Sequence, residues 1–119
     1  MSFPVLHTER LTLRAPGPED VPGMLAFLAS PRSRFYGGPM EAGPAWRRFA
    51  TFAGDWLLRG YGMFSLTRRD TGAPIGLAGP FHPADFAEPE LAWLLNDAAH
   101  EGQGFAREGC LAVLRYLFA

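Results

Sequence analysis

The sequence predicts an α/β (α+β) fold in which a mixed, mostly antiparallel sheet is flanked by helices in the order β-α-α-β-β-β-α. Short segments that are apolar or alternating, bounded by turn residues, are typical of strands. They lie at 5–14, 61–68, 74–81 and 88–96. Longer segments with apolar residues at helical spacing lie at 19–29, 44–59 and 105–119. The 119 residues, 48% hydrophobic and 19% charged, suffice for one domain with one core.

The first half of the chain begins with a half-buried strand and continues into two helices. Leu11 and Leu13 alternate with polar neighbours, which is the pattern of a strand with one buried face. The segment 15–18 ends this strand, because Pro and Gly interrupt regular structure. A loop at 30–43 separates the two helices, and Pro44 suits the first turn of the second helix.

The second half contains a meander of three strands. The turn residues 69–72 join the segments 61–68 and 74–81 into a hairpin. Within the second of these strands, Gly76 and Gly79 indicate a bulge or the close approach of another backbone. The third strand then pairs with this hairpin and leads into a polar loop.

The last helix follows a loop that contains two glycines. Gly102 and Gly104 precede the expected helix start at Phe105. Glycines there let a ligand approach the backbone, and the free N–H groups of the first turn bind anions with the help of the helix dipole. Leu111 and Phe118 fall outside the main apolar stripe of this helix. That stripe is expected to contain Ala106, Cys110, Val113, Leu114 and Leu117.

Other phosphate-binding loops fit this segment less well. A dinucleotide-binding fingerprint needs a third glycine at a fixed spacing after the first strand, and Gly109 comes two positions late. A Walker A loop needs a lysine, and the chain contains none. A nucleotide-binding domain is therefore disfavoured, while a helix start that happens to carry glycines stays open as an alternative.

The loop resembles that of a known family. The segment Glu101-Gly102-Gln103-Gly104-Phe105-Ala106 is similar to the Gln/Arg-x-x-Gly-x-Gly/Ala loop of the GNAT acetyltransferases, with a glutamate in place of the usual Gln or Arg. The run 103–108 resembles the Gly-Tyr-Ala-Thr-Glu-Ala signature of the RimJ/RimL-like (ribosomal-protein N-acetyltransferase-like) branch. The segment 8–14 is similar to the Thr-Glu-Arg-Leu-x-Leu-Arg opening of that branch.

The resemblance implies a GNAT-like sheet and an acetyl-CoA site. In the family, the loop amides hold the pyrophosphate of acetyl-CoA, and backbone amides of the preceding strand hold its pantetheine. The residues implied in binding this cosubstrate are Leu94, Leu95, Glu101, Gly102, Gln103, Gly104, Phe105, Ala106 and Arg107.

The resemblance also implies positions for the reaction and the acceptor. Glu90 begins the strand where several GNAT enzymes place a general base, although a solvated strand end is the alternative. Core packing is the alternative for the aromatic residues of the second helix. The loop residues that would meet an acceptor are Arg32, Arg34, Phe35 and Tyr36.

The function implied is an acetyl-CoA-dependent N-acetyltransferase that acts on a primary amine, either a protein N-terminus or a small molecule. The resemblance covers residues 1–119 as a single N-terminal portion of the acetyltransferase domain. The family's C-terminal strands and helix, which usually supply the general acid, have no counterpart in these residues. A non-catalytic module that binds CoA or another protein is therefore the alternative.

Composition and pattern also bear on partners. The net charge of −1 and the absence of a basic tract argue against nucleic acid. The sequence has no signal peptide and no apolar run long enough for a membrane span, so we expect a cytoplasmic protein with no membrane partner. The histidines and the single cysteine lack ligand spacing, which predicts no metal. An open edge at strand 90–96 and the uncovered Leu111 and Phe118 on the last helix predict a homo-oligomer, with binding of the remaining segment of a longer parent as the alternative.

Overall fold

A computed structural model describes residues 2–119 of the chain. Two strands come first, followed by two α-helices, three further strands and a last α-helix, with 3-10 segments (η) before each of the helices. In chain order the elements are β1 (Leu6–His7), β2 (Leu11–Arg14), η1 (Pro18–Asp20), α1 (Val21–Ala29), η2 (Pro31–Tyr36), α2 (Ala42–Arg59), β3 (Phe64–Arg68), β4 (Pro74–Phe81), β5 (Glu90–Leu95), η3 (Ala98–His100) and α3 (Phe105–Leu117).

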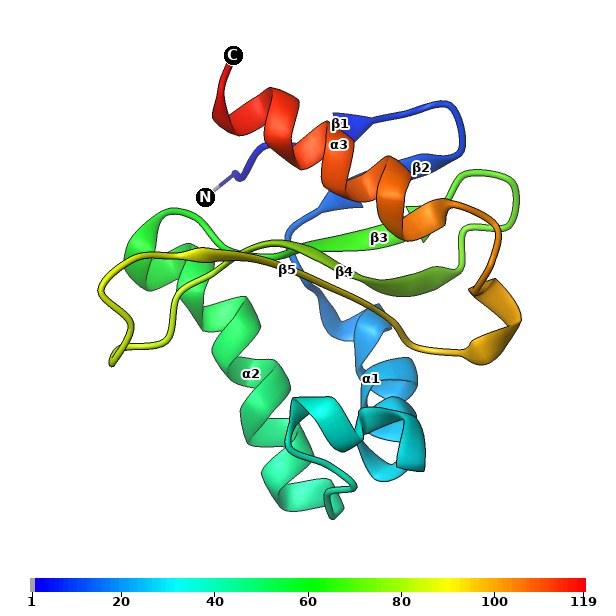
Figure 1. Cartoon of the computed structure of the whole chain (residues 1–119), viewed down its shortest axis with the longest axis vertical. Coiled ribbons are helices and arrows are strands. Elements are labelled where there is room, and N and C mark those ends of the chain that lie inside the picture. Colours follow the sequence, from blue (N-terminus) through cyan, green and yellow to red (C-terminus); the bar gives the residue numbers. More distant parts are fainter. Residues whose placement is uncertain (1) are drawn as a thin grey trace.

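The strands form one five-stranded sheet in the order β1-β2-β3-β4-β5. Each pair of neighbours is antiparallel. Helices α1 and α2 lie on one face of this sheet, and α3 crosses the other face (Figure 1). The predicted fold class, a sheet flanked by helices, is confirmed. Within the described residues β5 pairs only with β4, so β5 is an edge strand.

The first predicted strand is a hairpin of two strands. Leu6 of β1 pairs with Leu13 of β2, and the chain reverses between them. The side chain of Thr8 stabilises this reversal, because its hydroxyl accepts a hydrogen bond of 3.0 Å from the N–H of Leu11. The prediction of one continuous strand over 5–14 is therefore wrong. Its alternating pattern is real in β2, where Leu11 and Leu13 are fully buried.

Each face of the sheet has its own apolar core. Beneath α3, side chains of β2, β3 and β4 pack with Phe105, Ala112 and Val113. Beneath α1 and α2, Leu77 and Leu94 of the sheet pack with aromatic and aliphatic side chains of the two helices. Because β5 supplies residues to both cores, the edge strand is held firmly from both sides.

The two glycines of β4 lie where other backbone segments come close. A side chain at position 76 would collide with the carbonyl oxygen of Leu94 on β5. A side chain at position 79 would come within 2.9 Å of the carbonyl oxygen of Gly62. The pairing of β3 with β4 also shifts register between Leu66 and Thr67. The predicted bulge and close backbone approach are both confirmed.

The buried face of α3 differs from the predicted stripe. The buried residues are Phe105, Gly109, Ala112 and Val113. A Cβ at position 109 would lie 2.8 Å from a methyl carbon of Leu66, so this glycine lets α3 pack closely on β3. Of the predicted stripe only Val113 is fully buried. Leu111 and Phe118 are 37% and 82% exposed, which confirms that they lie outside the core.

Candidate functional site

The glycine loop leads into α3 with two residues in the left-handed backbone region. Gly102 has φ = 74°, and Gly104, the N-cap of α3, has φ = 81°. No side chain caps this helix start. The N–H groups of the first turn have no partner within a helix, so those of residues 105–107 are available to a ligand. With the helix dipole behind them, they form a cradle suited to an anion.

The β1–β2 hairpin holds this loop in place from ninety residues away. The Arg10 guanidinium donates a hydrogen bond of 2.9 Å to the carbonyl oxygen of Gln103 and one of 2.7 Å to the carboxylate of Glu108. It also lies 4.2 Å from the ring centroid of Phe105. The Thr8 hydroxyl donates to the same carboxylate. The two sequence segments that carry the family resemblance are thus in direct contact.

Glu108 is the centre of this contact. Burial by itself would raise the pKa of Glu108, but hydrogen bonds from Thr8 and Arg10 and the charge of Arg10 outweigh burial and lower it. The lowered pKa means that Glu108 stays ionised and that the network favours the charged form. The anchor of the glycine loop is therefore a charge-assisted network of partly buried groups.

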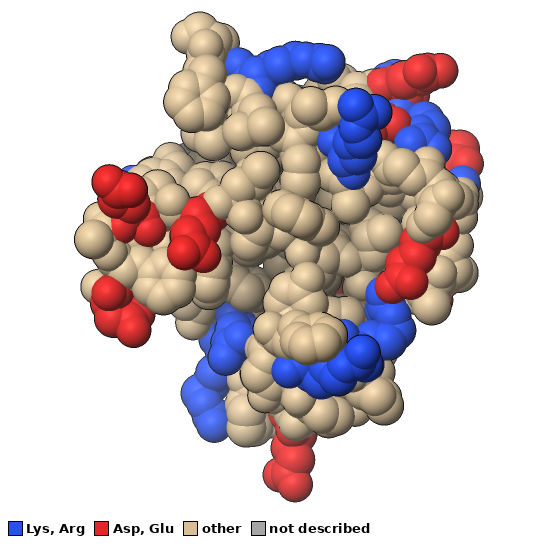
Figure 2. Space-filling view, viewed as in Figure 1, with Lys and Arg blue, Asp and Glu red and all other residues tan. Residues whose placement is uncertain are grey.

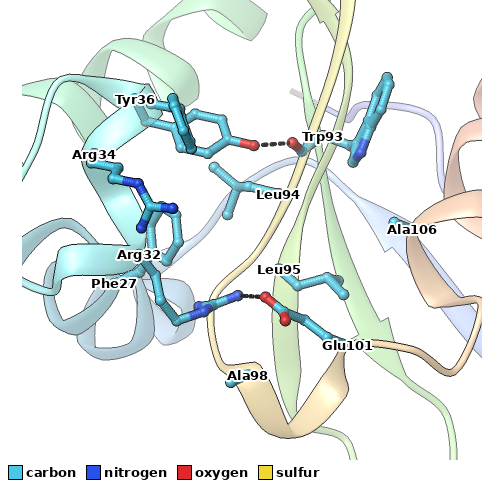
Figure 3. Close-up of a pocket in the computed structure, with 11 residues that line it drawn as sticks. Phe27, Arg32, Arg34, Tyr36, Trp93, Leu94, Leu95, Ala98, Glu101 and Ala106 are labelled. Carbon is cyan, nitrogen blue, oxygen red and sulfur yellow. Dashed lines mark hydrogen bonds and ion pairs between the residues drawn. The ribbon is translucent and has the colours of Figure 1, made fainter.

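A cleft of about 550 Å³ opens between η2 and the chain that runs from β5 to α3. Figure 3 shows Arg32, Arg34 and Tyr36 on the η2 side of this cleft. The β5 and loop side is formed by residues from Trp93 to Ala106. The predicted cosubstrate residues that line the cleft are Leu94, Leu95, Glu101 and Ala106. The loop residues predicted to meet an acceptor line it as well, namely Arg32, Arg34, Phe35 and Tyr36.

The remaining predicted loop residues lie beside the cleft. Gly102, Gln103, Gly104 and Arg107 are exposed around its end at the start of α3. Phe105 is 3% exposed and packs into the core beneath α3. Its side chain therefore has a structural role, and only its backbone N–H faces outward.

Every second residue of β5 directs its backbone N–H and C=O groups toward the cleft. The N–H of Asn96 bonds to Ile75 of β4 at 2.8 Å, and the carbonyl of Leu94 also points to β4. By strand alternation, Trp93 and Leu95 present their N–H and C=O groups to the free edge. Sequence reasoning named Leu94 and Leu95 and missed Trp93; the two-residue period of an antiparallel strand was the available signal.

The η2 segment contacts both ends of the opposite side. The Tyr36 hydroxyl donates a hydrogen bond of 2.8 Å to the carbonyl oxygen of Trp93 at the free edge of β5. Arg32 forms an ion pair with Glu101 across the cleft, as Figure 3 shows. Burial raises the pKa of Tyr36, which the nearby charge of Arg32 offsets in part. The phenol therefore remains a hydrogen-bond donor at neutral pH.

Glu101 stands where the family usually has an uncharged or basic residue. A carboxylate beside an anion cradle would repel a phosphate. Its pairing with Arg32 compensates this charge at the mouth of the cleft. The sequence alone gave no indication of this compensation, because the two residues lie far apart in the chain.

Glu90 is not among the residues that line the cleft. It begins β5 opposite Phe81 and is exposed. Together with Glu88 it borders a separate shallow groove in the β4–β5 turn. Glu90 shares a strand face with Ala92 and Leu94, so it lies on the α1 and α2 side of the sheet. The structure thus leaves its catalytic role as a prediction.

A smaller apolar pocket of about 230 Å³ adjoins the cleft. We call it the side pocket. It shares Phe35, Tyr36 and Leu94 with the cleft. Its other lining residues are Leu28, Gly37, Arg48, Phe52, Met63, Phe81 and Ala92. A molecule in the cleft could therefore extend an apolar group toward α2.

Residues 2–119 contain neither a candidate membrane span nor a candidate metal cluster. No helix there combines the length and apolar character that crossing a bilayer requires. No group of three or more His, Cys, Asp or Glu side chains there is placed to hold a metal ion.

Comparisons with solved structures give closely similar folds. An acetyltransferase from Agrobacterium tumefaciens is 40% identical, with a TM-score of 0.88, over 99% of this chain and 68% of its own. A protein of Bordetella pertussis assigned to the GNAT acetyltransferases is 27% identical, with a TM-score of 0.77, over 96% of this chain and 71% of its own. A GNAT acetyltransferase from Bacillus anthracis, 18% identical with a TM-score of 0.77 over 97% and 66%, shares the fold.

The chain thus spans about two thirds of the length of these proteins. A search among curated proteins gave no match. The family model for the acetyltransferase (GNAT) domain matches residues 10–119, which include strands β2 to β5, the cleft and the glycine loop. On this match and on its 40% identity to a solved acetyltransferase, the chain belongs to the GNAT acetyltransferase family.

Proposed function

We propose that the protein is an acetyl-CoA-dependent N-acetyltransferase of the cytoplasm that transfers an acetyl group to a primary amine. The observation that carries this proposal is the continuity of the anion cradle at residues 104–107 with the free edge of β5. A cradle for phosphate next to an extended backbone edge matches a cosubstrate that has a pyrophosphate at one end and an amide-containing arm at the other.

The chemical groups of the site match those of acetyl-CoA. The first-turn amides of α3 would bind the pyrophosphate, and Arg107 is exposed beside them. The outward backbone groups of Trp93 and Leu95 would hydrogen-bond the pantetheine amides, as an added strand would. Acetyl-CoA supplies an activated thioester, and the chain supplies its position next to the acceptor.

The reaction forms a C–N bond and breaks the C–S bond of the thioester. The amine must lose a proton, and the departing sulfur must gain one. We propose Glu90 as the proton acceptor, acting through water because it lies outside the cleft. Backbone N–H groups at the β5 edge would stabilise the charge that builds on the carbonyl oxygen.

We further propose that the protein belongs to the RimJ/RimL-like branch. The support is the contact between the segments 8–14 and 103–108, both of which resemble that branch. Arg10 and Glu108, one from each segment, form the ion pair at its centre. The resemblance thus rests on residues that work together in the structure.

The free edge of β5 supports a proposal about assembly. Trp93 on that edge is 50% exposed, and Leu111 and Phe118 on α3 are exposed as well. Unpaired edges and apolar patches favour association. We propose a homo-oligomer, which sedimentation equilibrium over a wide concentration range would test. A monomer at every concentration would contradict the proposal.

A second candidate function is a module that binds CoA without catalysis. The position of Glu90 outside the cleft favours this alternative. Both functions require the anion cradle at the start of α3. They differ only in whether the protein transfers the acetyl group.

Calorimetric titration with CoA and acetyl-CoA tests the proposal. Binding of both, together with release of free thiol when an amine is added, is the result expected of the enzyme. Binding without thiol release over a panel of amines would favour the module. Absence of binding would overturn both functions.

A further inference from the structure

Two arginines next to the cleft have no acidic partner. Within residues 2–119, neither Arg34 nor Arg48 forms an ion pair. Arg34 is exposed, with its guanidinium carbon 4.7 Å from the ring centroid of Phe35. Arg48 donates a hydrogen bond of 2.8 Å to the carbonyl oxygen of Tyr36, which leaves its other N–H groups available.

The two arginines border adjoining spaces. Arg34 lines the cleft, and Arg48 lines the side pocket. Phe35 and Tyr36 line both spaces, so these two residues lie between the space that Arg34 borders and the space that Arg48 borders. Figure 2 shows several basic side chains on the lower part of the molecule, over η2 and α2, where an acidic side chain also projects from the lower edge.

The charges around the two spaces do not balance. Their lining residues include one carboxylate, Glu101, and it is paired with Arg32. The charges of Arg34 and Arg48 are left uncompensated. An amine reaches the site as an ammonium ion, which two uncompensated arginines repel. A polyamine or a lysine side chain is therefore a poor match.

An anionic group on the acceptor would remove this conflict. Guanidinium groups bind carboxylate and phosphate oxygens through paired hydrogen bonds. The side pocket adds an apolar surface from residues such as Leu28, Phe52 and Met63, with room for one small group. The two features together describe a small molecule with an anionic end and an apolar body.

We propose, on the basis of the proposed acetyltransferase function, that the acceptor is such a small molecule. Its amine is accompanied by a carboxylate or a phosphate that Arg34 and Arg48 bind. Its apolar part enters the side pocket. A protein N-terminus is the wrong acceptor, since a peptide bond replaces the carboxylate beside its amine.

Four probes that share a phenylethylamine skeleton separate these chemistries. L-Phenylalanine carries a carboxylate, and O-phosphotyramine carries a phosphate. Phenethylamine carries neither group, and L-phenylalaninamide imitates a peptide N-terminus. The amide is a stringent comparison because its amine loses a proton more readily than that of the free amino acid. Without anion recognition, the amide would be the better acceptor.

The experiment is calorimetric titration of each probe into the protein, with and without saturating CoA. We expect at least one anionic probe to bind tenfold or more tightly than the amide and phenethylamine. Tighter binding of L-phenylalanine would indicate a carboxylate site, and tighter binding of O-phosphotyramine would indicate a phosphate site. Arg34→Gln and Arg48→Gln should each reduce the preference severalfold. Arg47→Gln, the same change at an exposed neighbour that lines neither space, should leave it intact.

Three outcomes would overturn the inference. One is equal or tighter binding of the amide. Another is no binding of any probe to protein that binds CoA. The third is that Arg34→Gln and Arg48→Gln weaken CoA binding and leave probe binding unchanged, which would assign the arginines to the cosubstrate phosphates. If CoA itself fails to bind, the proposed function fails, and a retained probe preference without CoA still supports the anion site. Arg34→Gln changes an exposed side chain, so folding is not at risk.

Discussion

The two walls of the cleft present different groups to a ligand. One wall presents backbone groups and consists of residues 101–107, at the start of α3. The opposite wall presents side chains and consists of residues 32–36 of η2. We call them the α3 wall and the η2 wall. The α3 wall is anchored by the contacts of Thr8 and Arg10 with Gln103 and Glu108. The η2 wall meets the other side through one hydrogen bond and one ion pair, and Phe35 on it is 82% exposed.

This difference separates two tasks. Backbone N–H groups fixed by a network suit a ligand part that is the same in every turnover, such as a pyrophosphate. The exposed side chains of η2, Arg34 and Phe35, can adopt different positions for different acceptors, because few contacts restrict them. We therefore propose that the cosubstrate binds the α3 wall and that the η2 wall sets selectivity for the acceptor. The predictions below test that assignment.

The largest effect is expected from Gly104→Val. Position 104 has φ = 81°, a conformation that a β-branched residue adopts only at a cost of about 1–3 kcal/mol. The new side chain would also lie where a phosphate must approach the backbone. We expect CoA affinity to fall about a hundredfold or more by calorimetry, which corresponds to roughly 3 kcal/mol.

Gly72→Val is the matched control for this change. Gly72 also has a left-handed backbone, with φ = 77° and open space around it, but it lies in the β3–β4 turn. The control should lower stability while CoA affinity stays near that of the parent. If Gly104→Val binds CoA as tightly as the parent does, the α3 wall is not the phosphate site.

Glu90→Gln should lower the rate without changing CoA affinity. A general base contributes roughly a hundredfold or more, so kcat/KM should fall by about that factor in a form of the protein that turns over. The acidic limb of its pH profile should shift as well. Glu88→Gln, two residues away in the same turn, should change neither quantity. An unaltered pH–rate profile would remove Glu90 from the mechanism.

Local signals in the sequence identified the α3 wall and much of the fold. The glycines at 102 and 104 predict a backbone suited to anions, and both have the left-handed conformation. Strand 74–81 was predicted with its bounds intact, because turn residues flank it on both sides. Gly76 correctly predicted that the backbone of β5 approaches closely. Each of these signals depends only on residues near one another in the chain.

Contacts between distant residues were beyond sequence reasoning. Nothing near Thr8 indicates that it binds Glu108, or that Arg32 pairs with Glu101. The buried face of α3 was misjudged because Gly109 has no apolar side chain to mark it, although Leu66 packs against it. The compensation of the Glu101 charge by Arg32 likewise emerges only when the chain is folded, whereas strand alternation could have identified Trp93.

A moderate effect on stability is expected from Glu108→Gln. Hydrogen bonds from Thr8 and Arg10 hold the pKa of Glu108 below its usual range, despite burial. The native state thus favours the ionised group, and its contribution is present above the unfolded pKa, which is about 4.3. That contribution is lost as the pH falls from the unfolded pKa through the lowered native pKa. The variant should lose about 1 kcal/mol at neutral pH, allowing for partial solvent screening.

Urea unfolding at several pH values would measure this effect. The gap between parent and variant should be widest at neutral pH and should close in acid. CoA affinity should fall severalfold in the variant, since the carboxylate orients the Arg10 side chain that binds Gln103. A gap that is constant with pH would show that the network does not depend on the charge of Glu108.

The smallest effect is expected from Tyr36→Phe in the η2 wall. The variant loses the hydrogen bond from the phenol to the Trp93 carbonyl, which contributes about 1 kcal/mol to stability. Burial keeps the pKa of Tyr36 above its ordinary value, so this bond persists at neutral pH and its loss should not vary with pH there. If the η2 wall serves selectivity, CoA affinity should stay within about threefold while acceptor KM changes more. A tenfold loss of CoA affinity would contradict the division of labour between the walls, because the η2 wall would then be part of the cosubstrate site.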